Sequence, residues 1–164
     1  MKRPMPELST ARDAAPDERW MEEALRLARL AELGGEVPVG AVVVYEGRIV
    51  GRGWNQVVAL GDPTAHAEMQ ALREAARELG NYRLGGCELY ATLEPCAMCA
   101  GAIVHSRISR LIFGARDSKA GAVGGAMQVV NHPCLNHWVE VTEGVLGGRC
   151  MEMLQAFFRE RRKS

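Results

Sequence analysis

The sequence lacks an excess of charge of either sign. Lys and Arg together number 20, Asp and Glu also number 20, and the formal net charge is therefore zero. No overall electric field would draw the chain to nucleic acid or to a membrane surface, so any polyanionic partner must be bound by a local cluster of cations. Long apolar runs are also missing, and none approaches the roughly 18 residues of a membrane-spanning helix. We therefore expect no membrane partner.

Secretory features are absent as well. The N-terminal segment MKRPMPELSTARDAAPDER has no apolar stretch of the kind found in signal peptides, so we expect a cytoplasmic protein. The segment is polar and contains proline, which predicts a disordered extension over residues 1–15. Internal repeats and an interdomain linker are lacking too, so residues 16–164 are expected to form a single domain.

Cysteine is present in an odd number, five. Without an export signal, metal binding or catalysis is favoured over a disulfide framework. Cys96 and Cys99 form a Cys-x-x-Cys pair, whereas Cys87, Cys134 and Cys150 are expected to be buried free thiols.

Apolar periodicity alternates between helical and extended patterns along the chain. Helices are expected over residues 17–33, 65–79, 95–106 and 146–164. Strands are expected over residues 39–54, as two strands joined by a turn at Glu46-Gly47, and over residues 87–93, 109–115 and 138–144. The glycine-rich stretch from Ala115 to His137 is expected to be a functional loop with a short helical piece. This order predicts an α/β fold, a three-layer α/β/α sandwich with a central mixed sheet of about five strands.

The Cys-x-x-Cys pair follows Pro95, a residue favoured in the first turn of a helix. Side chains at positions i and i+3 are neighbours on a helix, about 5–6 Å apart at Cβ. That spacing allows the sulfur separation of about 3.8 Å that tetrahedral zinc requires. A helix N-terminus also favours the thiolate form that binds metal. Two core thiols or a redox pair are the alternatives for Cys96 and Cys99.

His66 also stands at an expected helix start, after Pro63 and Thr64. If both helix N-termini point at one centre, His66, Cys96 and Cys99 supply three ligands and leave the fourth position to water, the pattern of a catalytic zinc. Glu68 cannot share a helix face with His66, but at a helix end the two can converge, and Glu68 could then exchange protons with the bound water. A histidine with ordinary hydrogen bonds and a solvated glutamate are the alternatives.

These residues resemble a known family signature. His66-Ala67-Glu68 and Pro95-Cys96-Ala97-Met98-Cys99 are similar to the H-x-E…P-C-x-x-C pattern of the zinc-dependent deaminases of the cytidine and deoxycytidylate deaminase superfamily. The longer stretches EVPVGAVVV, DPTAHAE, NYRL, LYATLEPCAMCAGAIVHSRI and FGARDSKAGA resemble the bacterial tRNA-specific adenosine deaminases. The resemblance covers about Glu18 to Arg162.

The resemblance implies hydrolytic deamination of adenosine to inosine at the wobble position of tRNA, in a zinc deaminase domain that forms a homodimer. One Zn²⁺ per subunit would provide a zinc-bound hydroxide, and Glu68 would shuttle protons to the base. The alternative enzyme acts by the same chemistry on a free base or nucleoside such as guanine or cytosine. Alternatives of another class are a zinc-bearing RNA-binding module without catalysis and a redox protein.

Further residues are candidates for substrate binding. The resemblance implies that Asn55 binds the nucleoside, that Ala67 offers backbone contacts to the base, and that Asp117 and Lys119 lie in a loop facing the RNA. A turn asparagine and a solvated loop pair are the respective alternatives.

The C-terminal stretch FFRERRKS combines aromatic and cationic side chains. Phe157, Phe158, Arg161 and Arg162 are therefore expected to stack on and hold the anticodon loop of tRNA, the expected partner. A helix with core phenylalanines and a solvated basic end is the alternative.

Overall fold

The computed structural model describes residues 14–163, and side chains from residue 16 onward. The predicted extension therefore lies outside the described residues up to residue 13, and its last two residues begin the first helix. None of the described helices has the length and apolar character needed to cross a membrane. The elements are α1 (Ala14–Leu33), β1 (Gly40–Tyr45), β2 (Arg48–Trp54), α2 (Val57–Leu60), α3 (Ala67–Leu79), β3 (Glu88–Leu93), α4 (Ala97–His105), β4 (Arg110–Ala115), β5 (Glu140–Glu143) and α5 (Gly147–Lys163).

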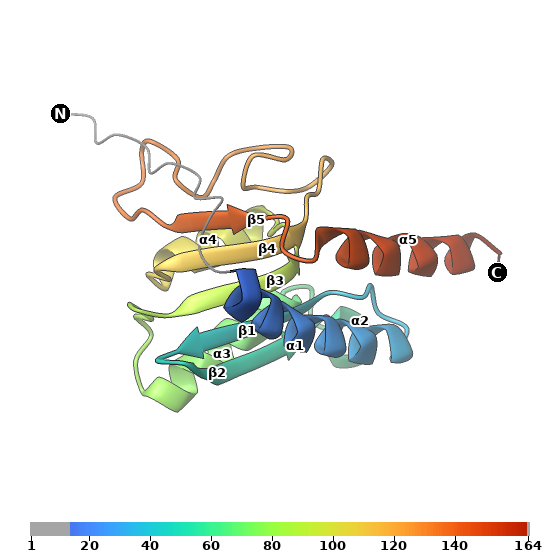
Figure 1. Cartoon of the computed structure of the whole chain (residues 1–164), viewed down its shortest axis with the longest axis horizontal. Helices are drawn as coiled ribbons and strands as arrows, with labels where there is room; N and C mark the ends of the chain where they lie inside the picture. The colour runs from blue at the N-terminus through green and yellow to red at the C-terminus, as the bar shows by residue number, and fades with distance from the viewer. Residues whose placement is uncertain (1–13, 164) are drawn as a thin grey trace.

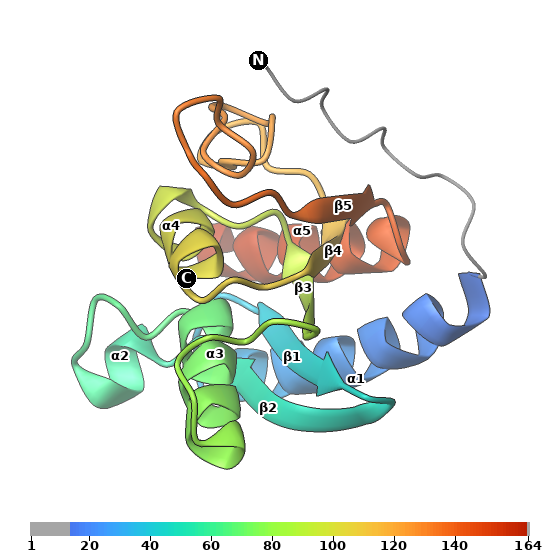
Figure 2. The ribbon, with the colours of Figure 1, turned by 90° about the vertical axis from the view of Figure 1, so that its left-hand side faces the viewer.

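The strands form one sheet in the order β2-β1-β3-β4-β5. β1 is antiparallel to β2 and β3, whereas β3, β4 and β5 are parallel to one another. Helices α1 and α5 cover one face of the sheet, and α3 and α4 cover the other (Figure 1, Figure 2). The predicted three-layer sandwich with a mixed five-stranded sheet is confirmed.

Strands β1 and β4, on either side of the central strand β3, explain why both faces of the sheet need helices. All of β4, and all of β1 except its last residue, is buried, as expected for strands covered on both sides. On one side, Met21 of α1 packs with Val42 and Tyr90 of the sheet. On the other side, Ala71 of α3 packs with Val43. Two apolar layers therefore hold the sheet between its helices.

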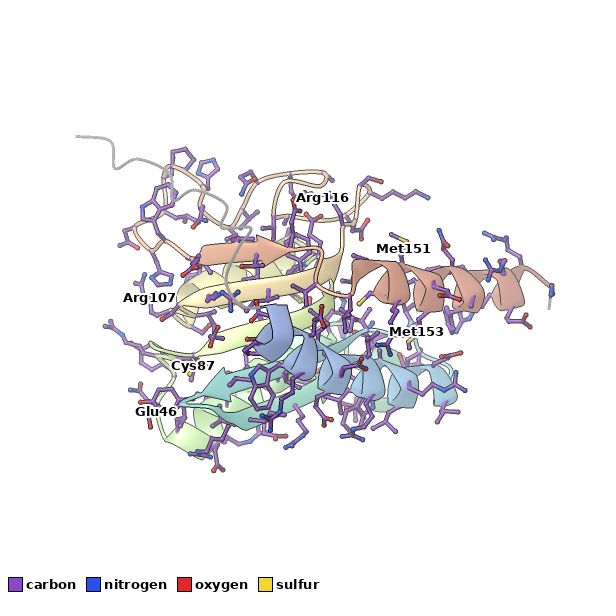
Figure 3. All side chains as sticks on the ribbon, in the orientation of Figure 1. Glu46, Cys87, Arg107, Arg116, Met151 and Met153 are labelled. Carbon is purple, nitrogen blue, oxygen red and sulfur yellow. The ribbon has the colours of Figure 1, made fainter. Side chains whose placement is uncertain are left out.

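The turn between β1 and β2 has the predicted form. Glu46 has φ 49° and Gly47 has φ 75°, so both central residues adopt the left-handed conformation that suits a tight hairpin. Figure 3 shows Glu46 at the tip of this hairpin.

Helix α3 lies unusually close to β2 because two glycines leave room for it. A Cβ atom on Gly51 would overlap the carbonyl oxygen of Ala71, and one on Gly53 would overlap that of Ala67. The first turn of α3 is therefore fixed directly against the sheet, which sets the position of the residues at its N-terminus.

One local expectation is wrong, and one short helix was missed. Residues 116–139 contain turns and isolated bridges but no helical piece. Three backbone N–H groups of this loop donate to a buried carboxylate, whereas in a helix they would donate to backbone carbonyl oxygens. The single turn α2 was not expected, since four residues are too few to show a helical period.

A buried polar cluster fastens α1 to the sheet. Arg110 of β4 places Nη2 2.6 Å from Asp17 Oδ2 in α1, and the Tyr90 hydroxyl donates to Asp17 Oδ1 at 2.9 Å. The guanidinium also bonds Glu88 at 2.7 Å. The pKa of Arg110 is raised, first of all by its hydrogen bond with Asp17, so the guanidinium keeps its positive charge.

Candidate metal centre

The three residues predicted as metal ligands lie together. His66 Nδ1 is 3.6 Å from Cys96 Sγ and 3.5 Å from Cys99 Sγ, and all three ligand atoms lie within 4.8 Å of one another. Tetrahedral zinc, with Zn–N of about 2.0–2.1 Å and Zn–S of about 2.3 Å, would separate nitrogen from sulfur by about 3.6 Å. The donor set and its spacing therefore fit a zinc ion.

The ends of two helices create this arrangement. His66 is the N-cap of α3 and Cys96 the N-cap of α4, both with extended backbone, and neither side chain caps its own helix. Cys99 follows in the first turn of α4. Both helix N-termini thus meet at one point, where their dipoles favour thiolates. His66 was expected within the first turn of α3, but it lies one residue before that turn.

The hydrogen bonds of the cluster separate the two thiols in acidity. Bonds with Cys99 and with His66 lower the pKa of Cys96 to about 4. The bond with Cys96, together with burial, raises the pKa of Cys99. The hydrogen bond between His66 and Cys96 raises the pKa of His66. Since a metal ion binds thiolates and a neutral imidazole, its binding here would release protons.

Glu68 lies beside the centre without being one of its ligands. It is the second residue of α3 and only 4% exposed. Burial raises the pKa of its carboxyl group, while a hydrogen bond from the Cys99 thiol lowers it. A solvated glutamate is thus excluded. The geometry places a buried carboxyl group in hydrogen-bonding contact with Cys99, one of the three candidate ligands.

Asn55 acts on the start of α3. Its Oδ1 accepts a hydrogen bond from the Ala67 N–H at 2.9 Å, and its own N–H donates to the Val39 carbonyl oxygen at 3.2 Å. The Ala67 N–H is therefore occupied and is not available to a base, which corrects part of the role expected for Ala67. The Asn55 Nδ2 group donates to no other described residue, so it remains available to a ligand.

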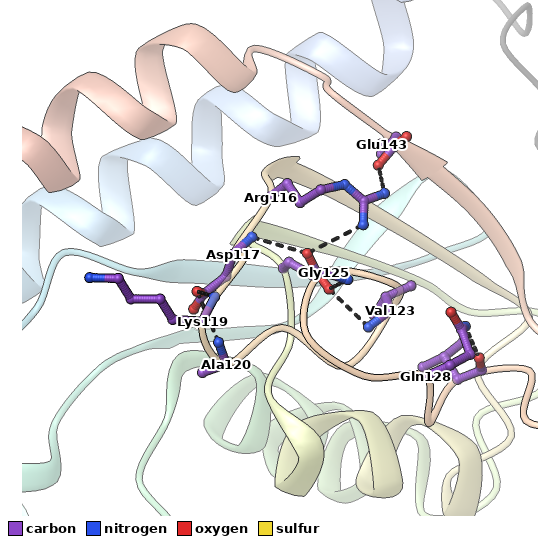
Figure 4. Close-up of polar contacts among 10 residues, drawn as sticks. Arg116, Asp117, Lys119, Ala120, Val123, Gly125, Gln128 and Glu143 are labelled. Atoms are coloured by element: carbon purple, nitrogen blue, oxygen red, sulfur yellow. Dashed lines mark hydrogen bonds and ion pairs between the residues drawn. The ribbon is translucent and has the colours of Figure 1, made fainter.

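Asp117 and Lys119 have different roles. Asp117 Oδ1 accepts hydrogen bonds from the N–H groups of Lys119 at 3.0 Å and Ala120 at 3.1 Å, which closes a local turn (Figure 4). The Lys119 side chain is exposed and lines an open groove of about 970 Å³ together with residues of α5. Both residues line the groove, and Asp117 also shapes the loop.

The residues at the end of α5 that were expected to bind RNA differ in their exposure and contacts. Phe157 is 8% exposed and packs edge to face on Phe158, which is 44% exposed. Arg161 donates to the Gly35 carbonyl oxygen at 2.6 Å, and its guanidinium carbon lies 4.8 Å from the centre of the Phe157 ring. Phe157 is thus a core residue and not a stacking platform, while Phe158 and the exposed Arg162 line the groove.

The prediction for the remaining cysteines is right for two and wrong for one. Cys87 and Cys150 are buried, and burial raises the pKa of each thiol to about 11. Cys134 is exposed, because it lies in the surface loop before β5, where its N–H bonds His132 Nδ1.

Sequence reasoning missed Glu94. Its side chain is fully buried, and its carboxylate accepts hydrogen bonds from the N–H groups of Asp117, Val123 and Gly125. The available signal was an acidic residue placed between a buried strand and Pro95, a position where an unpaired charge would be strongly destabilising.

Comparisons with known proteins agree with this geometry. A family model of the cytidine and deoxycytidylate deaminase zinc-binding region matches residues 14–115. The chain is 53% identical over 148 residues to the tRNA-specific adenosine deaminase of Haemophilus influenzae, covering 90% of this chain and 86% of that protein. It is 49% identical over 147 residues to the tRNA-specific adenosine deaminase of Bacillus subtilis, covering 90% and 91% respectively.

A solved structure from work on A-to-I editing by tRNA:A34 deaminases, at the wobble position of transfer RNA, matches with a TM-score of 0.81 and 45% identity. The match covers 83% of this chain and 99% of that one. The family region contains the three candidate zinc ligands and Glu68. The chain therefore belongs to the zinc-dependent cytidine and deoxycytidylate deaminase family and, within it, to the tRNA-specific adenosine deaminases.

Proposed function

We propose that this chain hydrolyses adenosine to inosine and ammonia at the wobble position of tRNA. The observation that carries the proposal is the buried Glu68 carboxyl group beside a His66-Cys96-Cys99 zinc site. A structural zinc site has four protein ligands and no use for a neighbouring carboxylate, whereas a hydrolytic site needs both an open position and a proton carrier. The relatives that match most of the chain carry the same activity in their names.

The roles of the residues follow from their places. A zinc ion, when bound, supplies a polarised water that can act as a nucleophile near neutral pH. Glu68 would take one proton from that water and deliver it to N1 of adenine, and would pass the second proton of the same water to the departing amino group. The water oxygen bonds to C6, the bond from C6 to the amino nitrogen breaks, and ammonia leaves. Asn55 would hold the nucleoside through Nδ2 while its Oδ1 fixes α3.

The groove beside α5 is the proposed site of the anticodon loop. Lys119, Arg159 and Arg162 provide cations along it, and Phe158 provides an exposed ring. Splayed bases stack on aromatic rings, and the phosphates beside them pair with Lys and Arg. A protein of zero net charge would thereby concentrate its cations where RNA passes.

Nucleoside analysis provides the test. Purified protein, loaded with zinc, would be incubated with unmodified anticodon stem-loop RNA, with total tRNA and with free adenosine, guanine and cytidine. Inosine in the RNA, with the free compounds unchanged, is the expected result. Turnover of a free base or nucleoside without turnover of RNA would replace this proposal by the alternative deaminase.

We also propose that the protein is a homodimer acting in the cytoplasm. Large apolar side chains are exposed at the end of α1 and in α2: Leu33 is 72% exposed, Val58 74% and Leu60 55%. Glu36, just after α1, accepts hydrogen bonds from the Val58 and Ala59 N–H groups at 2.9 Å, so the two segments lie side by side. Light scattering should give twice the chain mass, and Val58→Glu should lower it.

A further inference from the structure

The Glu94 carboxylate is a buried anchor for the loop that follows β4. Its side chain is 0% exposed. Oε1 accepts a hydrogen bond from the Asp117 N–H at 3.0 Å, and Oε2 accepts from Val123 at 2.9 Å and Gly125 at 2.8 Å. These bonds are drawn as dashed lines in Figure 4. One side chain thus replaces the regular backbone partners of the loop at three separate points.

The loop is shaped to enclose this carboxylate. A Cβ atom on Gly121 would overlap the Glu94 carboxyl group, and one on Gly125 would overlap the Asp117 carbonyl oxygen. Arg116 closes the outer side, with Nη1 3.6 Å from Glu94 Oε1. The missing side chains at both glycines therefore let the backbone wrap around the anchor.

The same loop joins the metal centre to the groove. On its inner side, Gly121 forms an isolated bridge with Cys96, and the Ala122 N–H donates to the Pro95 carbonyl oxygen at 2.8 Å. On its outer side, Asp117 and Lys119 line the groove that Phe158 and Arg162 line from α5. The loop therefore contacts both a proposed zinc ligand and the proposed RNA-binding groove.

We propose that Glu94 is a positioning residue for RNA recognition. By holding the N–H groups of Asp117, Val123 and Gly125, it fixes the loop wall at a set distance from the metal centre, so that an anticodon loop bound in the groove presents its adenosine to Glu68. The inference rests on the proposed function. Glu94 lies beneath the loop, fully buried, and acts on the substrate through the loop backbone.

Glu94→Gln tests this role with little change in volume. An amide keeps one acceptor oxygen, and its NH₂ group must face either Asp117 or the pair Val123 and Gly125. At least one of the three N–H groups is then left without its acceptor. We expect faster amide hydrogen exchange over residues 117–125, unchanged exchange in α5, and full zinc content. KM for an anticodon stem-loop should rise by about tenfold or more, the effect of one unsatisfied buried donor, with a smaller fall in kcat.

Glu143→Gln is the matched control. Glu143 forms the other ion pair of Arg116, but it is exposed, and among the described residues its carboxylate meets none of the loop N–H groups. Its exchange, KM and kcat should equal those of the wild type. A Glu94→Gln protein with wild-type exchange and KM would overturn the proposal. A loss of zinc content, a fall in kcat and a rise in KM, all by the same factor, would also overturn the proposal. Glu94 would then only support α4.

The proposed function and the role of Glu94 can fail separately. If the wild type forms no inosine in the stem-loop, the proposed function fails whatever the variant does. The exchange measurement needs no RNA, so it still decides whether Glu94 holds the loop. If the wild type is active and exchange changes while KM does not, the loop is anchored by Glu94 but does not position RNA, and the proposal is wrong.

Discussion

At the scale of single residues, the candidate metal centre needs two kinds of side chain, its ligands and the neighbouring carboxyl group. Cys96 and Cys99 lie 3.6 and 3.5 Å from His66 Nδ1, and Glu68 is buried against them. Removing a ligand should therefore affect metal binding and folding together, whereas removing the carboxyl group should affect chemistry alone. Two substitutions separate these effects.

Cys96→Ala should lose zinc and also lose stability, because part of the metal-binding energy at such a site is folding energy. Elemental analysis and thermal unfolding, with and without a chelator, measure the two effects. Cys87→Ala is the control, since Cys87 is a buried thiol outside the cluster. It should keep one zinc per chain and lose only about 1 kcal/mol of packing. Full zinc in Cys96→Ala would show that the ligand assignment is wrong.

Glu68→Gln should keep zinc, fold and RNA affinity and lose turnover by about 10²–10⁴-fold, the usual contribution of a general acid–base group. Glu74→Gln, on an exposed position of the same helix, should behave as wild type. Single-turnover assays on the stem-loop provide the measurement. Activity within a factor of about ten of wild type would place the proton carrier elsewhere.

At the scale of elements, residues distant in sequence hold the helices that carry the site. Asn55 bonds the first N–H of α3 from the end of β2, and Arg110 bonds Asp17 in the first turn of α1 from β4. Each contact fixes the start of a helix against the sheet. Substitutions at these contacts should lower stability because the start of α3 or α1 would no longer be fixed against the sheet.

Asn55→Ala should lower the free energy of unfolding by about 1 kcal/mol, as for the loss of a helix cap, and should weaken zinc retention because His66 and Glu68 begin the same helix. Asn55→Asp keeps the Oδ1 acceptor and should restore stability. It lacks Nδ2, so turnover should stay low if that group binds the nucleoside. Wild-type turnover in Asn55→Asp would show that Asn55 only supports α3. Denaturant unfolding and stem-loop kinetics distinguish these results.

Asp17→Ala should destabilise the fold by about 3–5 kcal/mol, because it leaves the buried Arg110 charge without its main partner. Glu88→Gln is the control. Glu88 bonds the same guanidinium, but its side chain is 35% exposed, so its loss should be clearly smaller. Chemical denaturation measures both losses of stability. Equal losses would mean that the partly exposed Glu88 stabilises Arg110 as much as the buried Asp17 does, and the prediction would be wrong.

At the scale of the whole molecule, a net charge of zero makes local placement decide where RNA binds. Arg162 and Lys163 are exposed at the end of α5, and Arg162 lines the groove. Arg161 also lines the groove, but its guanidinium bonds the Gly35 carbonyl oxygen and stacks on Phe157. A test of RNA binding should therefore spare Arg161, whose removal would also disturb the helix packing.

Replacing Arg162 and Lys163 by Ala should leave zinc and stability unchanged, weaken stem-loop binding, and make the slope of log affinity against log salt shallower by about 1–2 units. The control replaces Arg48 and Arg77, exposed cations of β2 and α3, which the groove does not contain. Titrations at several salt concentrations compare the three proteins. Equal slopes would show that the basic end of α5 is only a solvated helix end.

The sequence by itself determined the features that depend on local geometry. The spacing of Cys96 and Cys99, the helix start at His66 and the turn at Glu46-Gly47 each involve a few consecutive residues, whose backbone conformation their own side chains favour. The order of helices and strands followed from apolar periodicity in the same way. The structure therefore confirms these expectations, which required no knowledge of long-range contacts.

The tertiary structure alone decided which of the candidate side chains face RNA and which support the fold. Phe157 and Phe158 are adjacent in sequence, yet one is 8% exposed and the other 44%. Arg161 bonds a residue 126 positions earlier in the chain, and Glu94 bonds Gly125 across 31 positions. Such partners are brought together by packing of the sheet and its helices, and no periodic pattern records them. Burial and distant hydrogen bonds, not residue type, therefore assign these roles.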